Sequence, residues 1–232
     1  DMASLAAAGR VFFSLFCLAL VGFFAISIDG VYGVNRALVA DVLLWAVSAW
    51  AILLLWVLGY PRSAIVWGSR AMRCLIGVLV LVPAWLALAY LRSIEHGALW
   101  ILYVVALVAC ADIGAYFTGR AFGKHKLAPQ VSPGKTIEGL LGGLAAVCLL
   151  ALIVAYQAQP AGVTFTYLLV LSLVTGLVSA LGDLVESMVK RHRGIKDSGT
   201  ILPGHGGVMD RIDGLVAAVP VFALGIVMAA RY

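Results

Sequence analysis

Long apolar runs alternate with short polar stretches along almost the whole chain. Seven of these runs are close to the length of about 20 residues that a helix needs to cross a bilayer. They cover residues 11–28, 42–59, 72–91, 98–118, 137–156, 166–188 and 214–230. The pattern predicts an all-α, polytopic membrane protein with about seven transmembrane helices in this chain.

The composition supports this prediction. Of the 232 residues, 63% are hydrophobic and 12% are charged, and the mean hydropathy is +1.07. A soluble domain is about half apolar and about a quarter charged, so the composition excludes an ordinary soluble protein. The four cysteines lie in apolar runs, and we interpret them as small buried residues rather than disulfides or metal ligands; they are Cys17, Cys74, Cys110 and Cys148.

Two regions are predicted along the chain. Residues 1–97 form N-terminal transmembrane helices, and residues 98–232 hold both chemically rich loops, 119–136 and 189–213. The first apolar run lacks a cleavage site followed by a polar domain, so no secretory signal peptide is predicted. The chain begins at Asp1 rather than at a methionine, and we expect it to be a fragment with residues preceding it.

Lysine and arginine are divided unequally between the two sides of the predicted membrane. With seven spans, thirteen of these residues fall on the side of Arg10, and three fall on the other side: Arg36, Arg92 and Arg231. Because cytoplasmic loops carry an excess of Lys and Arg, loops 119–136 and 189–213 are predicted to face the cytoplasm. This excess is the ordinary bias of membrane proteins, so charge alone does not define a functional site.

Acidic residues mark the two ends of the longer loop. Asp183, Glu186, Ser187 and Lys190 are spaced to share one helix face at the end of the sixth span. Acids inside a span are costly unless they face protein or water. Glu186 and Lys190 could form a simple i,i+4 ion pair, and Asp183 could be a satisfied buried acid. Folding could instead bring Asp183 to Asp210, which would offer the hard oxygen ligands that Mg²⁺ prefers.

The loop between these acids combines cations with glycines. Cations beside a carboxylate–metal site suit a polyphosphate, and glycines allow backbone N–H groups to approach its oxygens. A flexible basic loop that binds anionic lipid head groups is the alternative, and Asp210 and Asp213 could simply complement the dipole of a helix start. The lipid-binding alternative does not account for the interleaved acids. The cations are Lys190, Arg191, Lys196 and His205, and the interleaved acids are Asp197, Asp210 and Asp213.

The shorter loop contains SPGKT, Ser132 to Thr136, which superficially resembles the end of a P-loop. The required first glycine is absent, so a Walker A motif is rejected. Lys135 and Thr136 nevertheless stand at the start of the fifth span, and a helix N-terminus with a lysine and hydroxyls is suited to an anion. The alternative is a capped helix entry with Glu138 in its first turn.

Asp112 is a further acid within a predicted span. Tyr116 and Arg120 follow it on the same helix face. About two turns separate Asp112 from Arg120, so an ion pair between them would need a water-filled funnel or a local bend.

The spacing of the polar residues from Ser187 to Asp213 resembles the signature of the phosphatidate cytidylyltransferases, also called CDP-diacylglycerol synthases. The stretches "GKHKLAPQVSPGKT" and "GDLVES" are also similar to that family. The resemblance implies an integral enzyme of the inner membrane that converts CTP and phosphatidic acid into CDP-diacylglycerol and pyrophosphate. It implies dependence on Mg²⁺ with room for a second cation, a homodimer, and no nucleic-acid partner. Family members usually have further N-terminal helices.

The same resemblance assigns roles to individual residues. It implies that Asp183 and Asp210 bind the metal and that these two acids, with Lys190 and Lys196, are catalytic. The substrate-binding residues are then Asp112, Ser132, Lys135, Thr136, Ser187, Arg191, Asp197, His205 and Arg211.

Three rival functions would also place charged residues in a membrane protein. A transporter or channel would be favoured by inverted repeats and by acids at mid-membrane in both halves, whereas the acids of this chain gather at one end. A lipid kinase or another CTP-using lipid transferase differs only in the signature. A lipid-binding scaffold without chemistry does not explain the carboxylates.

Overall fold

The computed structural model describes residues 36–158, 163–199 and 206–229. Within these ranges, six helices are long and apolar enough to cross a membrane. They are α2 (Arg36–Leu58), α4 (Arg70–Ser93), α5 (Gly97–Phe122), α6 (Ile137–Ala158), α7 (Phe165–His192) and α8 (Met209–Ala229). Six of the seven predicted spans are therefore confirmed, and the first, at 11–28, lies outside the described residues.

Two elements were not predicted. A short helix, α3 (Ala64–Trp67), lies between α2 and α4, and a hairpin of β1 (Lys126–Ala128) and β2 (Ser132–Thr136) joins α5 to α6. The strands are antiparallel, with Lys126 opposite Thr136 and Ala128 opposite Ser132. The all-α fold class is therefore confirmed, with one small two-stranded sheet added between α5 and α6.

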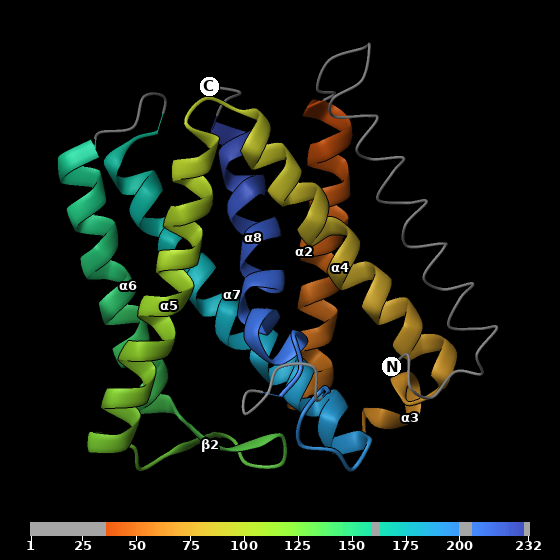
Figure 1. Ribbon diagram of the computed structural model, residues 1–232. Helices are drawn as coiled ribbons and strands as arrows, with labels where there is room; N and C mark the ends of the chain where they lie inside the picture. The colour runs from red at the N-terminus through yellow and green to blue at the C-terminus, as the bar shows by residue number, and fades with distance from the viewer. Residues whose placement is uncertain (1–35, 159–162, 200–205, 230–232) are drawn as a thin grey trace.

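Helix α8 lies at the centre of the bundle (Figure 1). Nearly all of its side chains from Val216 to Val227 are buried, and α7, α4, α2 and α5 pack against it. A Cβ atom at Gly182 of α7 would collide with the carbonyl oxygen of Asp213 in α8. This glycine therefore lets the two helices meet closely next to Asp183.

The α5–α6 pair packs on small residues as well. A Cβ atom at Gly114 would lie 2.8 Å from the Gly142 oxygen and 2.9 Å from the Ala146 Cβ atom. Small residues that allow close approach are typical of helix interfaces in membranes, where packing rather than the hydrophobic effect drives association. The close pairing brings the C-terminal end of α5 next to the N-terminal end of α6 and the hairpin.

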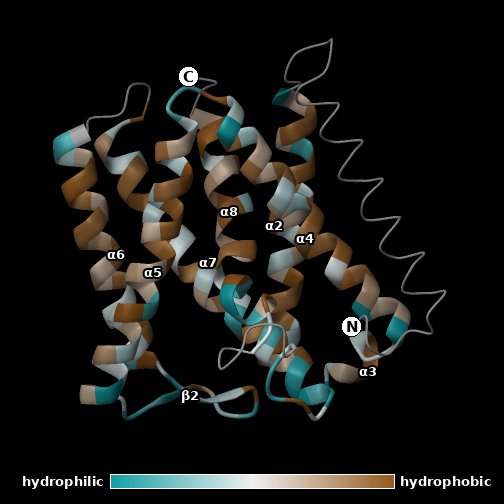
Figure 2. Cartoon of the chain, in the orientation of Figure 1, coloured by the Kyte–Doolittle hydropathy of each residue, from teal (hydrophilic) through white to brown (hydrophobic). Residues whose placement is uncertain are grey.

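The polar connections gather at the two ends of the bundle. The α2–α4 connection, the hairpin and the α7–α8 connection lie at one end, at the bottom of Figure 1, and the α4–α5 connection lies at the other. Figure 2 shows hydrophilic residues collected at the hairpin end and hydrophobic residues along the helices. Loop 119–136 and the described parts of loop 189–213, residues 189–199 and 206–213, therefore lie on one side, as predicted. That this side faces the cytoplasm stays a prediction.

Candidate functional site

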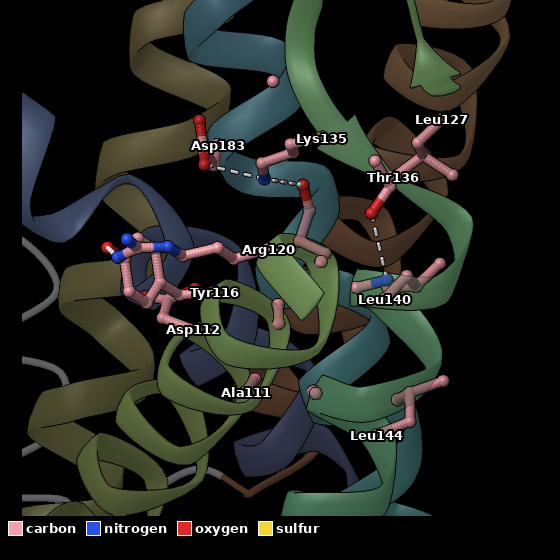
Figure 3. Close-up of a pocket in the computed structure, with 17 residues that line it drawn as sticks. Ala111, Asp112, Tyr116, Arg120, Leu127, Lys135, Thr136, Leu140, Leu144 and Asp183 are labelled. Carbon is pink, nitrogen blue, oxygen red and sulfur yellow. Dashed lines mark hydrogen bonds and ion pairs between the residues drawn. The ribbon is translucent and has the colours of Figure 1, made fainter. Parts of the chain in front are cut away.

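A cavity of about 460 Å³ opens between α5, α6, α7 and β2 at the hairpin end (Figure 3). Small side chains of the three helices make room for it, and polar side chains enter it from α5, β2 and α7. The small residues include Ala111, Ala115, Gly143, Gly176 and Ala180, and the polar ones are Asp112, Tyr116, Arg120, Lys135, Thr136 and Asp183. A cavity with convergent charged groups in an apolar bundle is the candidate site.

Lys135 joins the hairpin to α7 inside this cavity. Its Nζ atom lies 2.7 Å from Asp183 Oδ2 and donates to the Ala180 carbonyl oxygen at 3.3 Å (Figure 3). Ser187 donates from its hydroxyl to Asp183 Oδ1 at 3.1 Å. Both oxygens of Asp183 thus have a partner, one from the hairpin and one from the next turn of α7.

Further carboxyl groups surround this ion pair. Asp112 interacts electrostatically with Lys135, Asp183 and Asp213. Asp213 interacts electrostatically with Asp183, Lys135 and Glu186. The acid of α8 that interacts electrostatically with Asp183 is therefore Asp213 rather than the predicted Asp210. Close packing at Gly182 places it there.

Asp210 belongs to a second network. Lys190 Nζ lies 2.7 Å from Asp210 Oδ1 and 2.9 Å from Glu186 Oε2. Asp210 also accepts hydrogen bonds from the Ser198 N–H at 2.9 Å and the Gly207 N–H at 2.7 Å. The i,i+4 pair of Glu186 and Lys190 is confirmed, but it is part of a three-residue network that ties α7 to α8.

The metal prediction can be compared with this geometry. In residues 36–158, 163–199 and 206–229, no group of three or more His, Cys, Asp or Glu side chains is arranged to hold a metal ion. Mg²⁺ commonly takes only one or two carboxylates and fills its other positions with water and phosphate oxygens. Asp183, with Asp112 and Asp213 in electrostatic reach, supplies hard oxygen donors of this kind. Such oxygen donors suit Mg²⁺ chemically, although Asp183 and Asp210, the two predicted ligands, engage different lysines.

The start of α6 is a capped helix entry, as the alternative interpretation of SPGKT predicted. The Thr136 hydroxyl accepts a hydrogen bond from the Gly139 N–H at 3.1 Å. Glu138 accepts hydrogen bonds from the N–H groups of Lys124 and His125 and lies 2.6 Å from His125 Nδ1. Glu138 therefore holds the chain entering the hairpin, while Lys135 is left to face the cavity.

At the end of α5, Arg120 donates to the Tyr116 hydroxyl at 3.2 Å. Arg120 thus contacts the aromatic residue one turn away, and Asp112 lies a further turn along the helix, as its offset predicted. All three side chains line the cavity (Figure 3). They bring a cation, a phenol and a carboxyl group to the same wall.

The remaining predicted residues lie around the cavity rather than in it. Arg191 donates from Nε to the Val131 carbonyl oxygen at 3.3 Å, which fixes the end of α7 to the hairpin. Ser132 is half-buried in β2. Lys196 and Asp197 are exposed in the α7–α8 connection, and Arg211 is exposed in the first turn of α8. His205 lies outside the described residues.

Comparison with known proteins identifies related chains. The model of the cytidylyltransferase family matches residues 2–229. A phosphatidate cytidylyltransferase of Pseudomonas aeruginosa is 51% identical over 186 residues, which cover 80% of this chain and 69% of that protein. Proteins of the same name from Haemophilus influenzae and Bacillus subtilis are 47% and 40% identical, over 77% and 62% of this chain. The matched regions span 65% and 56% of those two proteins, so the chain matches roughly two thirds or less of these relatives' length.

Proposed function

Because the chain belongs to the cytidylyltransferase family, we propose that it transfers the cytidylyl group of CTP to phosphatidic acid, as a phosphatidate cytidylyltransferase of phospholipid biosynthesis. The products are CDP-diacylglycerol and pyrophosphate. The observation that carries the proposal is the contact between Lys135 of the hairpin and Asp183 of α7 inside a polar cavity of the membrane bundle.

The reaction suits a site made of cations and carboxylates. An oxygen of the lipid phosphate attacks the α-phosphorus of CTP, and the bond from that phosphorus to the bridging oxygen of the β-phosphate breaks. The attacking phosphate is already an anion near neutral pH, so little help from a general base is needed. The barrier lies in bringing two anions together and in stabilising the charge on the departing pyrophosphate.

Three cations at different positions around the cavity can stabilise that negative charge. Lys135 stands in the cavity, Lys190 stands between α7 and α8, and Arg191 lies where α7 meets the hairpin. Lys196, exposed on the α7–α8 connection, is the cation best placed to meet a nucleotide arriving from water. Ser132, Thr136, Ser187, Asp197, His205 and Arg211 complete the proposed substrate contacts.

Mg²⁺ is the proposed cofactor, with room for a second cation. Asp183 would hold it together with Asp210, and Asp213 is the alternative second ligand because it interacts with Asp183. Bound there, the ion would neutralise phosphate charge. The protein's own part is to hold these carboxylates in place through Ser187, Lys135 and Lys190.

The proposed setting is the inner membrane, with the hairpin end facing the cytoplasm. CTP then reaches the cavity from water, and phosphatidic acid reaches it sideways from the bilayer. The excess of Lys and Arg on this side supports the orientation. A homodimer is proposed from the family resemblance, and chemical crosslinking in nanodiscs would test it.

A direct assay separates this function from its rivals. The purified chain in nanodiscs is given CTP labelled at the α-phosphate, dioleoyl phosphatidic acid and Mg²⁺. Labelled CDP-diacylglycerol is expected, Asp183→Asn should abolish it, and Glu95→Gln, at an exposed acid on the opposite end, should not. Release of CDP in place of pyrophosphate would indicate a kinase. Ion flux in proteoliposomes without any lipid product would indicate a transporter.

A further inference from the structure

The connection between α2 and α4 presents apolar side chains outward. We call residues 58–70, which include α3, the elbow. Leu58, Ile65 and Val66 have relative exposures of 72%, 92% and 59%. Water-facing connections between spans are normally polar, and exposed apolar side chains that cluster mark an interaction surface. The elbow lies at the same end of the bundle as the hairpin and the candidate site (Figure 1).

The outward direction of these side chains is fixed by the inside of the elbow. Trp67 is fully buried, its indole N–H donates to the Ser63 hydroxyl at 3.2 Å, and that hydroxyl donates to the Trp56 carbonyl oxygen at 2.6 Å. The Tyr60 ring stacks on Trp67 with centroids 6.2 Å apart. Arg73 donates to the Gly68 carbonyl oxygen. Since Trp67 points inward, its neighbours Ile65 and Val66 point away from the bundle.

The charges of the elbow have one sign. Arg62 and Arg70 are exposed on either side of α3. No Asp or Glu occurs in the sequence between Asp41 and Glu95. Because α2 and α4 both cross the membrane, the elbow that joins their ends lies at the bilayer surface. Apolar side chains flanked by arginines at that depth match a surface of anionic lipid, whose acyl region accepts the former and whose phosphates accept the latter.

We propose that the elbow docks on the anionic lipid surface at the site end of the protein. Ile65 and Val66 insert at the boundary between head groups and acyl chains, and Arg62 and Arg70 bind lipid phosphates.

The docked elbow also contacts the element that carries the site's cations. The rings of Trp67 and His192 lie with centroids 4.9 Å apart, and a Cβ atom at Gly68 would lie 3.0 Å from two atoms of the His192 ring. His192 is the last residue of α7, next to Lys190 and Arg191. Lipid docking therefore sets the depth of this end of α7 relative to the head groups.

The test reads docking directly and does not depend on turnover. In the full chain with its four cysteines replaced by alanine, a spin label is placed by Ile65→Cys, or by Lys124→Cys as a control in the exposed loop at the same end. Each protein is placed in nanodiscs of phosphatidylcholine alone and of an equal mixture with phosphatidylglycerol. Collision rates with oxygen and with a water-soluble nickel chelate report the depth of the label.

Docking predicts that the label at position 65 favours oxygen over nickel and that the control label favours nickel. Phosphatidylglycerol should shift the label at position 65 further toward oxygen, and the double change Arg62→Gln with Arg70→Gln should remove that shift. Nickel access equal to that of the control would overturn the proposal. Protection from both reagents would also overturn it, because protein, either residues 1–35 or a second copy, would then cover the elbow. If the label at position 65 favours oxygen but the unlabelled chain makes no CDP-diacylglycerol from CTP and phosphatidic acid, the result counts against the proposed function and not against docking.

Discussion

Lys190 is the position at which we expect one substitution to lower the free energy of unfolding most. Its ammonium group lies between Glu186 and Asp210, at 2.9 Å and 2.7 Å. The side chains of Lys190, Glu186 and Asp210 have relative exposures of only 16%, 8% and 11%. The change Lys190→Met keeps a long apolar stem and removes the charge, so both acids lose their shared cation.

The size of the effect follows from what each acid retains. Asp210 keeps hydrogen bonds from the Ser198 N–H, the Ser198 hydroxyl and the Gly207 N–H, so its loss is partly compensated. Glu186 accepts from Lys190 through Oε2, its buried Oε1 has no hydrogen-bond partner among the described residues, and its side chain is the more buried of the two acids. Removing one partner of a buried ion pair costs about 3–5 kcal/mol because the other charge is left uncompensated. We expect Lys190→Met to lower the free energy of unfolding by about that amount.

The measurement is unfolding by SDS titration in mixed micelles, followed by circular dichroism. Lys124→Met is the matched control, because Lys124 is exposed at the same end of the bundle. Adding Glu186→Gln to Lys190→Met removes the uncompensated charge and should recover roughly half of the loss, since neutral partners avoid the penalty of a buried ion. Lys190→Arg, which keeps the charge, should lose less than Lys190→Met.

Two results would refute this reasoning. If Lys190→Met unfolds within about 0.5 kcal/mol of the Lys124→Met control, the range of an ordinary surface change, the network does not stabilise the protein. If Glu186→Gln adds to the loss instead of relieving it, the penalty does not come from an uncompensated Glu186.

Three further predictions can be checked separately. Asp210→Asn and Asp213→Asn should both reduce turnover. The acid whose replacement raises the Mg²⁺ concentration for half-maximal activity by tenfold or more is the second metal ligand. If neither replacement changes the Mg²⁺ requirement, neither acid belongs to the metal site. Glu138→Gln should speed amide hydrogen exchange in the hairpin, because the Glu138 carboxylate accepts hydrogen bonds from two backbone N–H groups. Unchanged protection would show that these hydrogen bonds do not stabilise the hairpin. In a cysteine-free background, Lys124→Cys and Arg92→Cys should react with an impermeant maleimide from opposite sides of the membrane, and labelling from one side would contradict the topology.

The membrane spans could be predicted because their signal is local. Length and apolarity along one segment decide whether a helix crosses a bilayer, and six predicted runs coincide with helices. The predicted boundaries differ from the observed ones where a helix continues into polar residues. Helix α8 begins at Met209, so Asp210 and Asp213 lie in its first two turns rather than before it. The hairpin was missed because its strands are three and five residues long, and β2 contains Pro133 and Gly134.

In the site as well, contacts within one helix could be predicted from the sequence and contacts between elements could not. Offsets along one helix correctly placed Ser187 on the same face as Asp183 and predicted the ion pair of Lys190 with Glu186, since helical geometry fixes both. The partners from other elements, Lys135 for Asp183 and Asp210 for Lys190, depend on how helices pack. The interaction of Asp213 with Asp183 was not predicted for the same reason. Gly182, just before Asp183, is a sequence signal that another helix can approach closely at this point.

The balance of charge in the site supports the case for a bound cation. Among the described residues, the two networks and the cavity wall bring together five carboxyl groups and three basic side chains: Asp112, Asp183, Glu186, Asp210 and Asp213 against Lys135, Lys190 and Arg120. With every group ionised, two negative charges are in excess.

An excess of buried carboxylates is neutralised either by protons or by a cation. A triphosphate would add further negative charge to the same space, and protons on the carboxyl groups would do nothing to attract it. A divalent cation cancels an excess of two, and its remaining coordination positions accept phosphate oxygens. The proposed Mg²⁺ site therefore predicts that CTP binds weakly to the metal-free protein and that Mg²⁺ and CTP bind with positive coupling in calorimetry.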